Sequence, residues 1–105
     1  MELIAEATDG EEALNITRAL KPDLLLLDIR MHRWSGLQVL QSLRNDRNPV
    51  AVVFFSSNSE PPYVDAAMRL GANAFVAKTS GLDTLLAAIH AVRDGLPPED
   101  PKSHL

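Results

Sequence analysis

Two apolar runs stand out along the chain, and each is closed by a polar residue. Residues 24–27 are four leucines followed by Asp28, and residues 50–55 are followed by Ser56. Short continuous apolar runs between polar residues are typical of strands that are buried on both faces, as in parallel sheets. Two further candidate strands, one weaker at the start of the chain and one near its end, are residues 3–5 and residues 74–77.

Segments with helical spacing alternate with these strands. They predict helices over residues 11–20, from 35 to about 44, 61–70, and from 82 to about 93. The last of these is expected to place its large apolar residues on one face: Leu82, Leu85, Leu86, Ile89 and Val92. The resulting order, strand and helix in alternation, predicts a parallel sheet with helices on both faces.

Polar residues at the expected helix ends support these boundaries. Asp9 with Glu12 is expected to cap the first helix, and Ser35 opens a capping-box pattern three residues before Gln38. Gly71 is expected to follow the end of the third helix, where a left-handed backbone favours glycine.

Length and composition narrow the class of protein. The chain has 105 residues, enough for one small domain, which we assign to residues 1–95, with the proline-rich residues 96–105 as a tail or linker. The formal net charge is −4 and no basic block occurs, so we expect no direct nucleic-acid binding. The absence of cysteine excludes disulfides and thiolate metal sites. No apolar run is long enough for a membrane span and no secretory signal is visible, so a cytoplasmic location is expected.

Three polar residues each close a predicted strand: Asp28, Ser56 and Lys78. Because the carboxyl ends of parallel strands meet at one edge of the sheet, we expect these side chains to converge there. The carboxylate can act as a nucleophile towards phosphorus and form an aspartyl phosphate, while the ammonium and the hydroxyl can bind phosphoryl oxygens. The set therefore indicates phosphoryl transfer onto Asp28.

The motifs around these residues closely resemble the receiver domains of two-component signalling, over about residues 3–95. By this resemblance Asp28 is the phosphorylated aspartate, Ser56 the switch hydroxyl, Lys78 the phosphate-binding lysine and Phe75 the switch aromatic, which moves inward when the hydroxyl engages phosphate. The residues of these motifs are most similar to those of regulators with a LuxR-type helix-turn-helix output domain. The segments that carry the resemblance are residues 6–13, 21–31, 35–37 and 71–78.

The resemblance implies a flavodoxin-like, doubly wound parallel sheet, but the sequence lacks the strand and helix with which the family pattern begins. That strand ends in an acidic pair that normally holds Mg²⁺. Asp28 and the main-chain carbonyl of Arg30 remain as ligands, and we expect them to bind Mg²⁺ weakly, because Mg²⁺ requires several oxygens in octahedral array. The missing strand is central in the family. We therefore expect either direct pairing of its two neighbours or unpaired edges, with a homodimer or a marginally stable fragment as the consequence.

Three functions remain open on these grounds. The first is a phosphoacceptor that takes phosphate from a sensor histidine kinase and switches an output domain or partner, and is not itself an enzyme. The second is a degenerate receiver that binds a partner without phosphorylation, which the missing acidic pair favours. The third, a small hydrolase or phosphatase, is disfavoured because no serine–histidine arrangement or nucleophile elbow is visible.

Each residue also has a plainer interpretation. Asp28 and Ser56 can be turn residues, Lys78 a surface charge and Phe75 a core residue. The matching intervals of the first three favour the functional interpretation. The histidines, His32, His90 and His104, show no metal-ligand spacing, and Trp34 is expected to be partly buried beside the site. By resemblance, Arg30 and Asn58 flank the path of the water that would hydrolyse an aspartyl phosphate, and shielding by Arg30 predicts slow hydrolysis.

Overall fold

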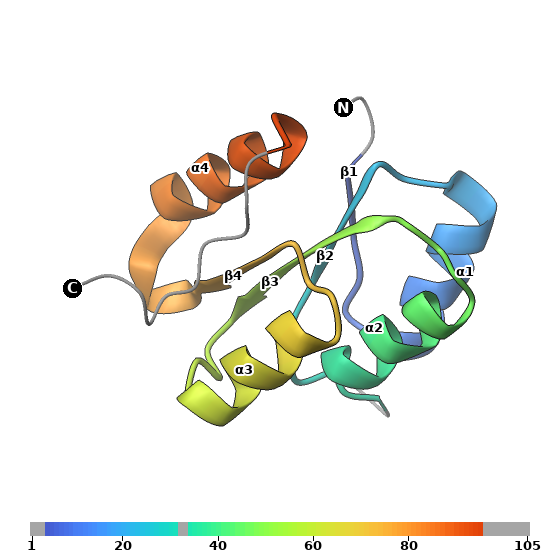
Figure 1. The fold of residues 1–105 in the computed structure, drawn as a ribbon, viewed down its shortest axis with the longest axis horizontal. Helices are drawn as coiled ribbons and strands as arrows, with labels where there is room; N and C mark the ends of the chain where they lie inside the picture. Colours follow the sequence, from blue (N-terminus) through green and yellow to red (C-terminus); the bar gives the residue numbers. More distant parts are fainter. Residues whose placement is uncertain (1–3, 32–33, 96–105) are drawn as a thin grey trace.

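A computed structural model describes residues 4–31 and 34–95 of the chain. Four strands alternate with four α-helices, and a short 3₁₀ helix follows the last strand (Figure 1). The elements in chain order are β1 (Ile4–Glu6), α1 (Gly10–Leu20), β2 (Leu24–Leu27), α2 (Gly36–Asn45), β3 (Ala51–Ser56), α3 (Pro61–Arg69), β4 (Ala74–Ala77), η1 (Lys78–Ser80) and α4 (Gly81–Arg93). The predicted element order is confirmed, and only η1 was not expected.

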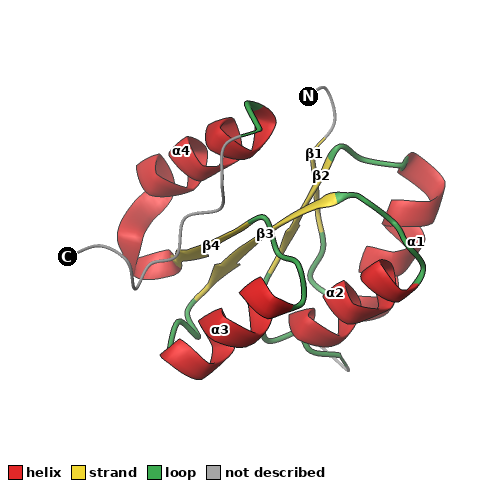
Figure 2. Ribbon diagram, viewed as in Figure 1, coloured by secondary structure: helices red, strands yellow, loops and turns green. Residues whose placement is uncertain are grey.

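The four strands form one parallel sheet in the order β1-β2-β3-β4 (Figure 2). β1 pairs directly with β2, with Ile4 opposite Leu24 and Glu6 opposite Leu26. The sheet therefore takes the first of the two options that the sequence left open, in which the neighbours of the family's central strand pair with each other.

Side chains alternate between the two faces of the sheet, as strand geometry requires. One face packs against α1, α2 and α3 and holds the larger core, including Leu25, Leu27 and Phe54. The other face holds a smaller core that includes Leu24 and Val53, and α4 is packed over β3 and β4 there. The helices thus lie on both faces, three on one and one on the other.

Capping at the helix starts agrees largely with the sequence. The Asp9 carboxylate accepts from the main-chain N–H groups of Glu11 and Glu12, and Ser35 with Gln38 forms the full capping box. The Glu12 side chain accepts from the N–H of Thr8 instead of closing a box on Asp9. Gly71 follows the third helix with φ +98°, the left-handed conformation that ends many helices.

The sheet covers only part of the apolar face expected for the last helix. Leu85 and Ile89 of α4 are buried against the sheet, but Leu82 and Leu86 are 68% and 52% exposed. Five large apolar residues span a wider arc of the helix than the sheet covers, so two of them lie outside the packed stripe.

In residues 4–31 and 34–95, no helix is long and apolar enough to cross a bilayer. The predicted tail, residues 96–105, lies outside the described residues, as do His32 and His104.

Candidate functional site

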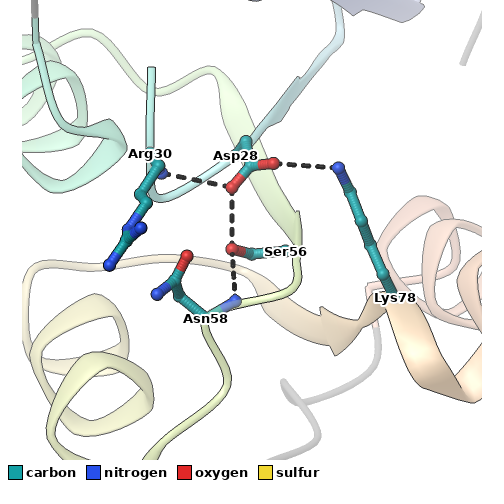
Figure 3. A network of polar contacts seen from close by, with 5 residues as sticks. All are labelled: Asp28, Arg30, Ser56, Asn58 and Lys78. Carbon is teal, nitrogen blue, oxygen red and sulfur yellow. Dashed lines mark hydrogen bonds and ion pairs between the residues drawn. The ribbon is translucent and has the colours of Figure 1, made fainter. Parts of the chain in front are cut away.

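Asp28, Ser56 and Lys78 converge at the carboxyl edge of the sheet, as predicted (Figure 3). The Ser56 hydroxyl donates to Asp28 Oδ1 at 2.7 Å. The Lys78 ammonium donates to Asp28 Oδ2 at 2.9 Å and forms an ion pair with it. The three residues lie at the carboxyl ends of β2, β3 and β4, so the parallel sheet itself brings their side chains together.

The turn after β2 holds the carboxylate from its other side. The main-chain N–H of Arg30 donates to Asp28 Oδ1 at 3.1 Å, and the N–H of Gly36 donates to the carbonyl of Ile29 at 2.7 Å. A Cβ on Gly36 would lie only 2.1 Å from the Asp28 carbonyl oxygen and 2.7 Å from Phe54. Only glycine fits here, so the start of α2 can approach the backbone that carries Asp28.

Ser56 is fully buried at the end of β3, and both functions of its hydroxyl are used. Its oxygen accepts from the main-chain N–H of Asn58 at 3.1 Å while the hydroxyl donates to Asp28. Lys78 is more accessible, with a side chain 47% exposed and its ammonium 6.0 Å from the centre of the Phe55 ring. Asp28 and Ser56 are thus held firmly, and Lys78 reaches them from the surface.

The Asp28 carboxylate is stabilised in its charged form. Partial burial raises the pKa of Asp28, but the hydrogen bonds from Ser56, from Lys78 and from the Arg30 amide together outweigh burial. The net pKa of Asp28 therefore lies below its ordinary value, and the group is an anion at neutral pH.

A small cavity of about 130 Å³ opens beside the carboxylate. Asp28, Arg30 and Lys78 line it together with Glu6, the last residue of β1, and Thr8, which follows that strand. No sequence pattern indicated these two residues, because they reach the cavity only through the direct pairing of β1 with β2.

Phe75 is buried, 2% exposed, and its ring centre lies 5.8 Å from that of Phe54. Its burial agrees with both sequence-based interpretations, as a core residue and as an aromatic that has moved inward. Trp34 is 36% exposed and packs against Gly10 at the start of α1, which agrees with the expected partial burial.

The donor set does not fit Mg²⁺ well. Asp28 already accepts three hydrogen bonds on its two oxygens, and the described residues contain no group of three Asp, Glu, His or Cys side chains that could hold a metal. Mg²⁺ requires near-octahedral coordination by oxygen. The Asp28 carboxylate, already engaged in hydrogen bonds, and the Arg30 carbonyl would supply only a small part of the six ligands.

A parallel sheet with a buried hydroxyl, a lysine and a charged aspartate at its carboxyl edge defines a response-regulator type of receiver. The family of response regulator receiver domains matches residues 1–90, and the chain belongs to this family. Receiver domains of this family generally bind Mg²⁺ at the phosphorylation site. The donor set of the described residues differs from that general property.

Among curated relatives, the DNA-binding transcriptional activator EvgA of Escherichia coli K12 is 33% identical over 95 residues, covering 90% of this chain and 47% of EvgA. The nitrate/nitrite response regulator NarL of the same strain is 32% identical over 93 residues, covering 89% and 43%. The chain thus spans about half the length of the curated relatives it matches.

Solved structures show the same fold. The signal receiver domain of response regulator NarL from Mycobacterium tuberculosis is 36% identical, with a TM-score of 0.70, and the match covers 82% of this chain and 67% of that one. A LuxR-family response regulator from Aurantimonas sp. SI85-9A1 gives a TM-score of 0.83 at 24% identity, covering 91% and 69%. The structural neighbours are receiver domains of the LuxR type.

Proposed function

We propose that this receiver domain is a phosphoacceptor, and that Asp28 takes a phosphoryl group from a phosphohistidine on a sensor histidine kinase. One observation carries the proposal: Asp28 is an anion that Ser56, at the end of β3, and Lys78, directly after β4, both contact beside an open cavity. A carboxylate with a lowered pKa is available as a nucleophile without the prior loss of a proton.

In the proposed step, an oxygen of Asp28 attacks phosphorus, the new O–P bond forms and the N–P bond to the histidine breaks. The imidazole leaves with the electron pair of that bond and takes a proton from solvent. Lys78, released from the carboxylate, pairs with the phosphoryl oxygens, and the Ser56 hydroxyl donates to one of them. Each group changes its partner without leaving the edge of the sheet.

The same proposal gives the chain its place in signalling. Residues 1–95 would form the receiver unit and residues 96–105 a linker or tail, in a cytoplasmic protein. The phosphorylated receiver would act on an output domain or partner in transcription regulation, with Phe75 as the switch aromatic beside Ser56. We assign no enzymatic activity and no direct nucleic-acid contact to this chain, and expect Mg²⁺ to bind weakly.

A second function is favoured by the poor fit of the site to Mg²⁺. In that case the domain would bind its partner without phosphorylation, and the contacts of Ser56 and Lys78 with Asp28 would hold one fixed conformation. Labelling with a small-molecule phosphodonor, with Mg²⁺ and with a chelator in its place, separates the two functions. The phosphoacceptor function predicts Mg²⁺-dependent labelling, weak in yield, whereas no labelling in either condition would leave the second function.

A further inference from the structure

A groove with aromatic rings and one cation in its lining lies between the loop after β2 and the first turn of α3. Its volume is about 480 Å³, and the described residues that line it are Ile29, Arg30, Met31, Trp34, Ser35 and Tyr63. Trp34 and Tyr63 are each 36% exposed, so part of each ring is open to a partner. Tryptophan, tyrosine, methionine and arginine are the residue types that are enriched in protein–protein interfaces. The lining therefore favours a protein as the occupant.

The groove adjoins the cavity beside Asp28. Arg30 and Met31 line both spaces, and the main-chain N–H of Arg30 donates to the Asp28 carboxylate at 3.1 Å. The groove thus begins one hydrogen bond away from the proposed nucleophile. A protein that brings a phosphorylated side chain to Asp28 therefore covers the adjoining part of the groove.

Trp34 is held in place in the free domain. A Cβ on Gly10 would lie only 2.3 Å from the Cβ of Trp34, so the tryptophan packs directly against the start of α1. The neighbouring Ser35 forms an antiparallel bridge with Arg30 and caps α2. A partner that binds here meets a preformed surface, and less conformational entropy is lost on binding.

Arg30 sets the charge of the groove. It is the only charged residue among the described residues of the lining, and its guanidinium takes part in none of the ion pairs between described residues. Figure 3 shows its side chain directed away from Lys78, which is already paired with Asp28. A carboxylate is the complementary group for a guanidinium, because two parallel hydrogen bonds can form.

We propose that the groove receives the segment of the phosphodonor protein that flanks its phosphohistidine. A carboxylate of that segment pairs with Arg30, and an apolar side chain packs against Trp34 and Tyr63. In a helix, four residues rise by ~6 Å, so a side chain one turn from the histidine is within reach of the groove. This inference rests on the proposed function. It assigns the two rings a role in the choice of donor and none in the transfer step.

Two phosphohistidine peptides test this recognition. Both are alanine-based helices of about 20 residues with a central phosphohistidine and a leucine one turn away. Beside the leucine, the first carries glutamate and the second lysine. The initial rate at which each peptide labels Asp28 is followed by intact mass, and the first is expected to label the parent about tenfold faster. Trp34 is the only tryptophan of the chain, so its fluorescence with the unphosphorylated peptides reports binding without phosphoryl transfer.

Substitutions separate the rings from the charge. Tyr63→Ala is expected to slow labelling by the first peptide about tenfold, while labelling by phosphoramidate, a small phosphodonor, stays at the parent rate. Leu20→Ala is the matched control, because Leu20 is 57% exposed on α1 and does not line the groove. Arg30→Glu is expected to reverse the preference in favour of the lysine peptide. Arg69→Glu, in the last turn of α3, is expected to keep the parent's preference.

The controls distinguish failure of this inference from failure of the proposed function. Equal rates for the two peptides in the parent, or equal rates for Tyr63→Ala and Leu20→Ala with the first peptide, would overturn the inference. Labelling of Asp28 by phosphoramidate would then leave the proposed function intact, whereas no labelling by phosphoramidate would overturn both. A change in Trp34 fluorescence that follows the concentration of the chain, and not that of either peptide, would assign the groove to a second copy and would also overturn the inference.

Discussion

Arg44, near the end of α2, joins the loop before β3 to the turn after α3, which is distant in sequence. Its guanidinium donates to the carbonyl oxygens of Asn48, Val50 and Gly71 and to the side-chain oxygen of Asn73, at 2.8–3.3 Å. Hydrogen bonds to a charged donor contribute about 1.5–3 kcal/mol each when buried. The bond to Gly71 is exposed, and partial burial lowers the pKa of Arg44, so desolvation of the cation offsets part of this gain.

We therefore expect Arg44→Ala to lower the free energy of unfolding by about 2–4 kcal/mol, a large share of the ~5–15 kcal/mol typical of a domain. Urea denaturation followed by circular dichroism, at one fixed low concentration, measures the change. Arg44→Lys should recover less than half, because an ammonium cannot reach all four acceptors in one plane. Arg69→Ala is the control, an exposed arginine in the last turn of α3. Equal losses in Arg44→Ala and Arg69→Ala would refute the role of the four hydrogen bonds.

Three further predictions concern the site. Gly36→Ala should cost about 1–3 kcal/mol of stability and reduce labelling of Asp28, because its methyl group would overlap the Asp28 carbonyl; unchanged melting would contradict this. The lowered pKa of Asp28 means that its charged form stabilises the fold above the unfolded-state pKa of about 4, and that this contribution is lost as pH falls through the folded-state pKa. The free energy of unfolding of the parent and of Asp28→Asn is therefore measured at neutral and at acidic pH. The difference between the two proteins should shrink on acidification, and a difference that does not depend on pH would contradict the lowered pKa of Asp28. A phosphorylated Asp28 should lose its phosphoryl group slowly and faster in Arg30→Ala, so equal decay rates would exclude shielding by Arg30.

The sequence was sufficient for the order of elements and for the three converging residues, and the physical reason is the same in both cases. Apolar runs such as residues 24–27 mark strands that are buried on both faces, and the polar residue after each run marks the edge where the strands end. The intervals between Asp28, Ser56 and Lys78 each accommodate one helix, so their convergence followed from the parallel order.

The pairing of the strands and the coverage of the last helix could not be predicted from a local sequence pattern. Strands that are apolar on both sides carry no mark of which neighbour they pair with, so the direct pairing of β1 with β2 remained one of two options. The positions of Glu6 and Thr8 at the cavity depend on that pairing. In α4, spacing indicated which residues are apolar but not how much of the helix the sheet covers, and the exposure of Leu82 and Leu86 was therefore missed.

The proposed phosphoacceptor role depends most directly on one measurement, the site and extent of labelling by a small phosphodonor in Mg²⁺. Intact mass is compared for the parent, for Asp28→Asn and for Asp46→Asn, whose aspartate caps the far end of α2. We predict the addition of one phosphoryl group to the parent and to Asp46→Asn, and none to Asp28→Asn. Equal labelling of the parent and Asp28→Asn, or no labelling of any of the three, would contradict the assignment of Asp28 as the phosphoacceptor.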